Sequence, residues 1–151
     1  MTVRKLIEEY LKEARLMQLA TSVNNQPWVC SVWFAPDKDL NIYWISSETR
    51  RHSQEVLKNN RVAGAIVLPQ TPQDKPRGLQ FQVVAEELSG RKEILNAIAL
   101  YVGRGIFSKE KVLQFMKDSE TPHRFYRIKP TQFVLFDAVH FPDNARQELR
   151  L

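Results

Sequence analysis

Three strand-forming segments follow one another near the amino terminus, with only short turns between them. The segments 16–23 (LMQLATSV) and 28–35 (WVCSVWFA) are rich in β-branched and aromatic residues, and 40–45 is a third segment of this kind. Turn-forming residues separate them: NNQP at 24–27 and PDKD at 36–39. Because turns this short join antiparallel neighbours, this part of the chain predicts a tight β-meander.

The rest of the chain alternates between helical and strand patterns. Near the amino terminus, apolar residues recur every three or four positions from Val3 to Ala14, which predicts an amphipathic helix with Thr2 as its N-cap. Further helices are expected at about 49–58, 91–102 and 109–117. Further strands are expected at 62–68, 78–88, 124–128 and 132–139, with a proline-rich loop at 69–76, a hinge at 129–131 and a loose tail from 142.

Six or seven strands, linked mostly by short turns and interrupted by one mid-chain helix, predict a mainly β fold of the α+β class. The expected architecture is an antiparallel sheet closed into a small barrel, with an N-terminal helix and peripheral helices, because closure removes exposed strand edges. A length of 151 residues fits a single domain, 1–151, with the barrel at about 15–139 and a charged tail at 142–151.

Composition narrows the function classes. The net charge of +5 invites a nucleic-acid hypothesis, but acidic residues interrupt most basic clusters and no DNA- or RNA-binding motif is present. The single Cys30 excludes an internal disulfide and a cysteine-based zinc site. No apolar run reaches the length of a membrane span, and the charged start MTVRKLIEEYLKEAR is unlike a signal peptide. A cytoplasmic protein without membrane or nucleic-acid partners is expected.

The segment 42–62 carries the clearest chemical signal. A strand runs into Ser46 and Ser47 and then into a short helix that opens on Thr49-Arg50-Arg51-His52. Free backbone N–H groups and the positive end of a helix dipole favour an anion at such a place, and arginine adds forked hydrogen bonds to phosphate oxygens. The pattern therefore predicts a phosphate site, against the alternative of a solvated basic helix end with a serine cap.

With these elements in order, the chain resembles the pyridoxamine 5′-phosphate oxidase-like, FMN-binding split-barrel superfamily. The resemblance runs from about Arg15 to Val139 and is closest to a small uncharacterised bacterial branch rather than to the vitamin-B6 enzyme itself. Four stretches carry it: LATSVNNQPWVCSVWF, the strand–serine–basic–helix segment ending in NNRVAGAIV, RGLQFQVVAEEL, and FYRIKPTQFVLFD.

The resemblance implies a homodimer with FMN at the subunit interface. In the family, one strand binds the flavin ring through its backbone. The resemblance places this strand on Val29, Cys30, Ser31 and Val32. The phosphate-binding hydroxyl falls on Ser46, with Ile45 beside the ring, and the basic pair at the helix start falls on Arg51 and His52. Gln80, on a strand that borders the flavin in the family, is a second-tier candidate.

Two positions depart from the family pattern. Arg50 replaces the usual serine before the basic pair, which keeps an anion donor but changes its geometry. His52 replaces lysine, and histidine is only partly charged at neutral pH. The C-terminal arginines that hold substrate phosphate in the B6 oxidase are not matched residue by residue in PHRFYRI or NARQELR, which argues against B6 oxidation.

Other candidate residues have plain structural alternatives. Trp33 is the preferred aromatic wall of a pocket, although an aromatic residue in a barrel strand is more often structural. Cys30 fits a small buried hydrophobe better than a reactive thiol. His123 and His140 lack metal-ligand spacing and are expected at the surface or an interface.

The expected function is therefore an FMN-binding flavoprotein, and within that class a flavin-dependent oxidoreductase acting on a small molecule that the sequence does not identify. No side chain stands out as a general acid or base. Three alternatives stay open: a flavin carrier or sensor without turnover, a haem or deazaflavin binder on the same scaffold, and a basic interaction module without a cofactor.

Overall fold

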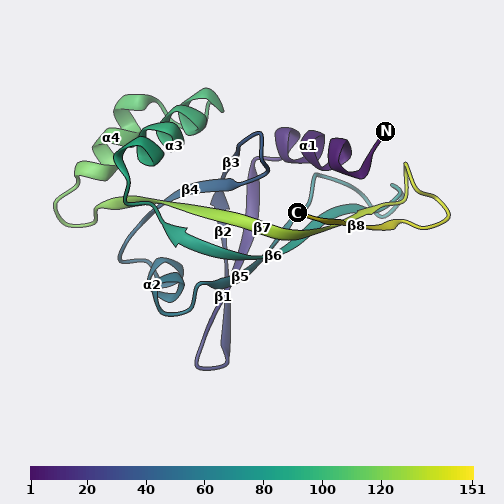
Figure 1. Cartoon of the computed structure of the whole chain (residues 1–151), viewed down its shortest axis with the longest axis horizontal. Coiled ribbons are helices and arrows are strands. Elements are labelled where there is room, and N and C mark those ends of the chain that lie inside the picture. Colours follow the sequence, from purple (N-terminus) through teal and green to yellow (C-terminus); the bar gives the residue numbers. More distant parts are fainter.

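An antiparallel sheet of eight strands forms the body of the computed structural model, which describes residues 1–151 (Figure 1). The strands are β1 (Leu16–Val23), β2 (Gln26–Trp33), β3 (Ala35–Pro36), β4 (Ile42–Ser47), β5 (Arg61–Ile66), β6 (Arg77–Glu87), β7 (His123–Asp137) and β8 (Arg146–Arg150). The helices are α1 (Val3–Glu13), α2 (Arg51–Lys58), α3 (Arg91–Gly103) and α4 (Lys109–Lys117).

The sheet curls into a barrel that stays split. Its strand order is β2-β1-β5-β6-β7-β4-β3, and β8 pairs with the second half of β7, beyond the stretch that pairs with β4. The two ends of this order do not pair with each other, so β2 keeps one open edge. The structure thus confirms the predicted antiparallel split barrel with an N-terminal helix. One seam of the barrel stays open.

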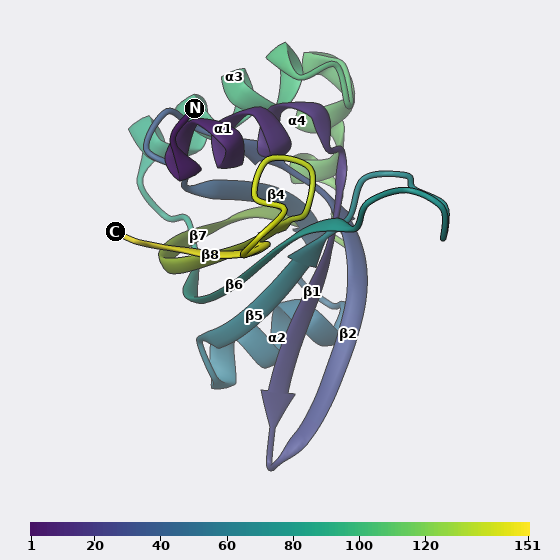
Figure 2. The ribbon, with the colours of Figure 1, turned by 90° about the vertical axis from the view of Figure 1, so that its right-hand side faces the viewer.

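Helices cover the parts of the barrel that the sheet leaves exposed. Figure 2 shows α1 crossing one end of the curled sheet, α2 lying nearer the other end, and the β1–β2 hairpin projecting beyond α2. One apolar core lies between α1 and the inner sheet face, and a second lies under α3 and α4. The hairpin turns at Asn24 and Asn25, both at positive φ, which asparagine tolerates better than most residues.

The structure differs from expectation near the carboxyl terminus. Residues 123–137 form one continuous strand, not two strands with a hinge, because a register shift opposite Gln82 and Val83 accommodates Pro130 within the pairing. The tail is not loose. Its residues 146–150 form β8, where Leu149 packs against the core while the charged side chains of alternate residues face outward.

Candidate ligand-binding cleft

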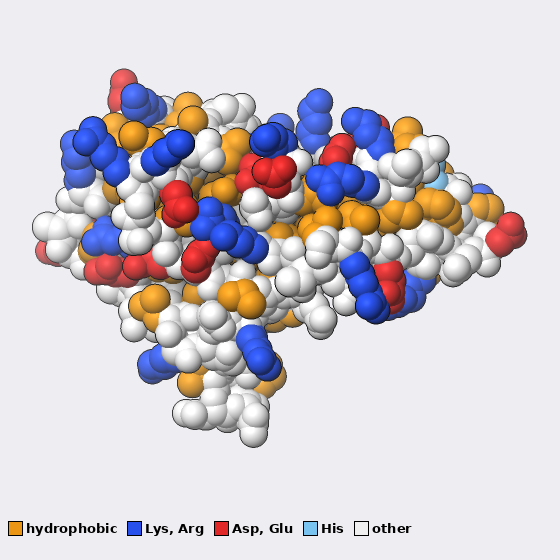
Figure 3. Space-filling view, viewed as in Figure 1, with side chains coloured by type: hydrophobic (Ala, Val, Ile, Leu, Met, Phe, Trp, Pro, Cys, Tyr) orange, Lys and Arg blue, Asp and Glu red, His pale blue; other side chains and the backbone are white.

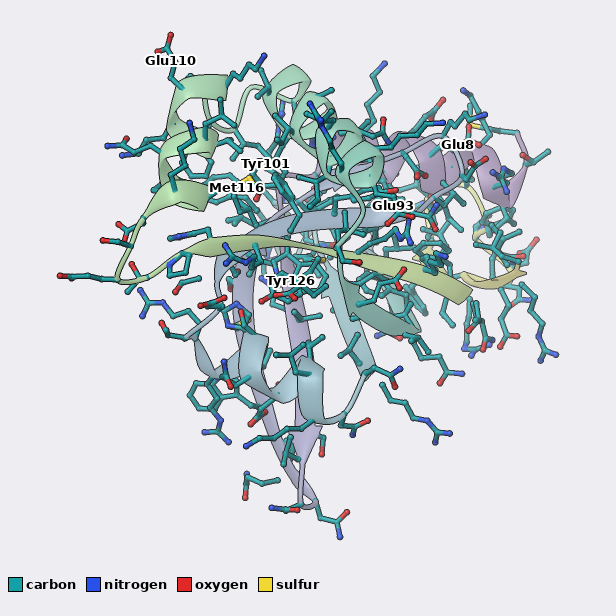
Figure 4. The ribbon with its side chains drawn as sticks, turned by 60° about the vertical axis from the view of Figure 1, so that its left-hand side comes forward. Glu8, Glu93, Tyr101, Glu110, Met116 and Tyr126 are labelled. Atoms are coloured by element: carbon teal, nitrogen blue, oxygen red, sulfur yellow. The ribbon has the colours of Figure 1, made fainter.

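A cleft of about 230 Å³ opens at the split seam of the barrel, between the open edge of β2 and strand β4. The start of α2 closes one end, and the α3–α4 layer closes the other. In Figure 4, the side chain of Tyr101, a residue of α3, lies between the helices and the sheet. The lining residues are Ser31, Val32, Trp33, Ile45, Ser46, Ser47, Arg50, His52, Tyr101, Phe107, Phe115 and His123.

The open edge of β2 offers backbone hydrogen-bonding groups to this cleft. The amide of Phe34 donates to the carbonyl of Arg15, which sets the alternation of bonded pairs along β1 and β2. By that alternation, the N–H and C=O groups of Val29 and Ser31 point away from β1 toward the open edge. The Trp33 carbonyl on the same edge accepts a hydrogen bond from the Tyr101 hydroxyl at 2.9 Å. The edge can therefore bind the polar rim of a flat ligand.

The polar end of the cleft is built by the β4–α2 junction. The hydroxyl of Ser53 donates to the Ser47 carbonyl at 2.8 Å and holds the helix start against the end of β4. Arg50 is the N-cap of α2, but its side chain forms no capping bond, so it remains available to a ligand. The first turn contains no acidic residue, which leaves the positive end of the helix dipole uncompensated there.

His52 faces this polar end and is bound to Ser46. Its Nε2 lies 2.9 Å from the Ser46 Oγ. Burial lowers the pKa of His52 below its ordinary value of 6.5, and the nearby charge of Arg50 lowers it further. At neutral pH the imidazole is therefore mainly neutral, and an incoming anion would favour its protonation.

The other end of the cleft is aromatic. The ring of Tyr101 stacks on Phe107, Phe107 meets Phe115 edge to face, and Phe115 stacks on His123 with ring centroids 4.6 Å apart. His123 Nδ1 lies 3.1 Å from the Thr121 carbonyl oxygen. Because a carbonyl only accepts, Nδ1 carries a proton, and in the neutral ring Nε2 then has a free lone pair. This end suits a flat, weakly polar group.

Six of the ten sequence-predicted site residues meet in the cleft: Ser31, Val32, Ile45, Ser46, Arg50 and His52. Arg51 does not line it. Its Nε donates to Glu55 at 3.0 Å and its guanidinium lies 4.1 Å from the centre of the Trp28 ring. Cys30 lies one residue from the cleft and packs against the core, and burial raises the pKa of its thiol to about 11.

The remaining two predicted residues, Val29 and Gln80, line a different hollow, on the outside of the barrel. Ser31 pairs with Gln18, Gln18 with Ala65, and Ala65 with Gln80, so three strand spacings separate Ser31 from Gln80. At about 4.8 Å per spacing this is roughly 14 Å along the sheet. Within one chain, Gln80 does not reach the cleft.

That outer sheet face carries no charge over a wide area. It consists of Gln18, Ala20, Val29, Ser31, Ala63, Ala65, Gln80, Gln82, Gln132 and Val134. Small side chains floor a hollow of about 520 Å³, which Arg146 borders. Val29 is 59% exposed. By contrast, Figure 3 shows charges of both signs interspersed over the face in view, without a continuous basic stripe.

The aromatic end was the part of the cleft that sequence reasoning missed, apart from Trp33. The missed residues come from α3, the α3–α4 loop, α4 and the start of β7, and none belongs to a local motif: Tyr101, Phe107, Phe115 and His123. No group of three or more His, Cys, Asp or Glu side chains is placed to hold a metal ion. No helix has the length and apolar character needed to cross a membrane.

Sequence comparisons find short matches. No family model matches the chain. A UPF0306 protein of Pasteurella multocida is 29% identical over 80 residues, which are 52% of this chain and 54% of that protein. A UPF0306 protein of Serratia proteamaculans is 28% identical over 90 residues, 59% and 62% of the two chains. The match thus spans less than two thirds of the length of these relatives.

Structural comparisons cover nearly the whole chain. HutZ, the haem storage protein of Vibrio cholerae, superposes with a TM-score of 0.70 at 21% identity over 86% of this chain and 91% of its own. A proposed pyridoxamine 5′-phosphate oxidase of Listeria innocua gives 0.66 at 18% identity, over 89% and 98%. ChuZ of Campylobacter jejuni gives 0.77 at 14% identity, over 98% and 59%. The chain has the split-barrel fold of pyridoxamine 5′-phosphate oxidase-like proteins.

Proposed function

We propose that this split-barrel protein binds FMN as a homodimer, with one cofactor in each seam cleft, and acts as a flavin-dependent oxidoreductase on a small molecule. One observation carries the proposal. The same cleft brings together a helix start with Arg50 and His52 and the unpaired backbone edge of β2. These are the two kinds of group that a flavin monophosphate needs, one for its phosphate and one for the polar rim of its ring.

The polar end of the cleft fits a phosphate. Ser46 supplies a hydroxyl, Arg50 a guanidinium without a capping bond, and the first turn of α2 its free N–H groups. His52 adds a fourth donor once it is protonated. The sequence departure at Arg50 is thus compatible with anion binding, because the arginine lines the same cleft as Ser46.

The size of the cleft argues for a second copy of the chain. Pockets for ligands of this class usually enclose about 300–1,000 Å³, whereas this cleft encloses about 230 Å³. The uncharged outer sheet face is the surface best suited to meet a second copy, since the cores of protein interfaces are depleted of charged residues. Gln80 lies on that face, so it would reach a cofactor only from the other subunit.

When bound, the flavin would supply the electron transfer. The residues of this chain would bind the phosphate, orient the ring along β2 and exclude water with the aromatic end. Tyr101 fixes the edge of β2 by its bond to the Trp33 carbonyl, and burial raises its pKa, so it stays protonated and is not a base at neutral pH. We assign no catalytic residue.

Haem is the second candidate, favoured by His123. Its free Nε2 beside Phe115 combines an iron ligand with an aromatic wall. A ligating histidine commonly donates its other ring N–H to a carbonyl, as His123 does to Thr121. HutZ, which shares the fold, is a haem storage protein.

An absorbance spectrum of freshly purified protein, followed by mass analysis of what heat releases, separates the candidates. The two bands of oxidised flavin, one in the near ultraviolet and one in the blue, support the proposal, and one intense Soret band supports haem. A deazaflavin would be recognised by its mass. Fast bleaching by NADH or NADPH and transfer of electrons to an acceptor distinguishes an oxidoreductase from a flavin carrier or sensor. Colourless protein that takes up no FMN on titration contradicts the proposal.

A further inference from the structure

The first turn of α2 is held from outside the cleft by the β1–β2 hairpin. Thr21 and Trp28 are direct partners across the two strands. The Thr21 hydroxyl donates to Glu55 Oε1 at 2.8 Å, and Arg51 Nε donates to Glu55 Oε2 at 3.0 Å. The Arg51 guanidinium lies 4.1 Å from the centre of the Trp28 ring. Thr21, Trp28, Arg51 and Glu55 are called the α2 clamp below.

The centre of the clamp is shielded from water and fully hydrogen-bonded. Thr21 is 2% exposed and Glu55 is 8% exposed. A carboxylate only accepts hydrogen bonds, and each oxygen of Glu55 has its own donor. The bonds from Arg51 and Thr21 lower the pKa of Glu55, so the carboxylate stays charged at neutral pH. Buried polar groups with all partners in place fix one geometry, because each alternative leaves a group unsatisfied.

We propose that the α2 clamp positions Arg50 and His52 for phosphate binding. Arg51 and Glu55 are one helical turn apart, so the hairpin fixes both the place and the rotation of the first turn. His52, the next residue along, is turned by about 100° from Arg51 and faces the cleft. Arg51 is thereby a positioning residue and not a phosphate ligand. This inference rests on the proposed function for the identity of the ligand.

The competing role for Arg51 is direct binding of phosphate, as the sequence pattern suggested. The two roles differ in what Glu55 should do. A direct ligand keeps its function when Glu55 loses its charge, whereas a clamp fails when either partner is removed. Changes to Arg51 and Glu55 should then be non-additive, because both disrupt the same contact.

The experiment titrates FMN into wild type, Glu55→Gln, Arg51→Met and the double variant. We expect each single variant to bind FMN about tenfold more weakly, the loss that corresponds to weakening one charge-assisted hydrogen bond to the phosphate. The double variant should bind no more weakly than either single one, and Arg51→Lys should recover part of the loss. Glu8→Gln is the matched control, because Arg4 and Glu8 form the same i, i+4 pair on α1, which does not line the cleft.

A second readout needs no ligand. The titration of His52, followed by NMR, should move toward the ordinary histidine value in Glu55→Gln, because a displaced first turn exposes the imidazole. Trp28→Leu repeats both measurements at a position that is 42% exposed, so we expect this variant to fold even if Glu55→Gln does not.

The outcomes separate the two proposals. FMN affinity lost in Arg51→Met but kept in Glu55→Gln and Trp28→Leu makes Arg51 a direct ligand and overturns the clamp. Wild type that binds no FMN overturns the proposed function alone. In that case the His52 titration decides the clamp: a shift in Glu55→Gln or Trp28→Leu supports it, and an unchanged titration in both overturns it.

Discussion

The Nε2 atom of His52 lies 2.9 Å from the Oγ atom of Ser46, inside a cleft that also contains Arg50. This contact joins the end of β4 to the first turn of α2. Both partners can turn their hydrogen bonds toward an anion, Ser46 as it stands and His52 after it takes up a proton. The family that the chain resembles has lysine at the position of His52. Because histidine replaces this lysine here, binding of FMN should depend on pH.

FMN affinity should rise as the pH falls from 8 to about 6.5. Burial and Arg50 lower the pKa of His52 in the free protein, whereas a bound phosphate dianion favours the protonated imidazole. Binding therefore takes up a proton, and the gain ends near pH 6, where the phosphate itself protonates. Calorimetry in two buffers of different ionisation enthalpy measures this proton uptake.

His52→Lys tests the same point with a permanent charge. This variant should bind FMN at least about tenfold more tightly than wild type at pH 8, since one charge-assisted hydrogen bond contributes about 1.5–3 kcal/mol. Its affinity should change little with pH. His140→Gln, at a histidine that does not line the cleft, should keep the wild-type profile. A flat profile in the wild type would exclude His52 from the site.

A charge on the outer sheet face should prevent dimer formation. Ala65 lies in the middle of that face, between Gln18 and Gln80. Burying an unpaired arginine at an interface costs several kcal/mol, so we expect Ala65→Arg to sediment as a monomer and to lose FMN affinity. Ala99→Arg, at an exposed position on α3, is the control and should remain dimeric. A dimeric Ala65→Arg protein would place the interface elsewhere.

Local sequence signals were enough for the hairpin but not for the whole site. The segment NNQP predicts a turn, and the structure has one there, with Asn24 and Asn25 at positive φ. Asparagine tolerates this conformation by itself, so the signal is contained in a few neighbouring residues. The bond from Tyr101 to the Trp33 carbonyl joins residues 68 positions apart, and that from Thr21 to Glu55 joins residues 34 apart. No local pattern contains such contacts. Arg51 suits a phosphate and a carboxylate equally well, and only the fold determines which one it meets.

The carboxyl-terminal segment is a second place where the local sequence did not predict the structure. The segment RQELR has no apolar run, so composition favours a loose end. In the folded chain, Gln132 to Phe136 of β7 provide a free strand edge, and pairing with it orders residues 146–150. Strand β8 therefore forms because it pairs with β7, and not because its own residues favour a strand, as is common for β-structure.

Gly64 should be intolerant of even one added carbon. A Cβ atom at this position would lie 2.3 Å from two ring atoms of Phe81, its cross-strand partner. Phe81 is 4% exposed and meets Phe133 edge to face, so the ring cannot move aside without disturbing the core. We expect Gly64→Ala to lower the free energy of unfolding by about 1–3 kcal/mol in urea denaturation.

Gly78→Ala is the matched control on the neighbouring strand. Its Cβ would meet nothing closer than 3.9 Å, and its backbone does not require a positive φ. We expect the free energy of unfolding of this variant to stay within about 0.5 kcal/mol of wild type, the usual range away from the core. Equal stability losses in the two variants would mean that backbone freedom, and not the Phe81 contact, explains the glycine at 64.

Asp137 should make the fold sensitive to acid. Its side chain is fully buried at the end of β7 and lies 3.4 Å from Arg77 Nε. It accepts hydrogen bonds from the backbone N–H of Val139 and from both the backbone N–H and the ring of His140. Burial alone would raise the pKa of Asp137, but these hydrogen bonds and the Arg77 charge outweigh it and lower the pKa. The stabilisation is therefore present above the unfolded-state value of 3.8 and is lost as the pH falls through the lower folded value.

Asp137→Asn removes the charge but keeps the size of the side chain. At pH 7 we expect it to lower the free energy of unfolding by about 3 kcal/mol, because Arg77 loses its partner and His140 loses a charged acceptor. Below pH 4 the wild type should lose stability more steeply than the variant, so the two curves should approach each other. Urea denaturation at a series of pH values measures both, with Asp143→Asn at an exposed position as the control. A constant stability difference from pH 7 to pH 3 would show that Asp137 acts through hydrogen bonds alone and not through its charge.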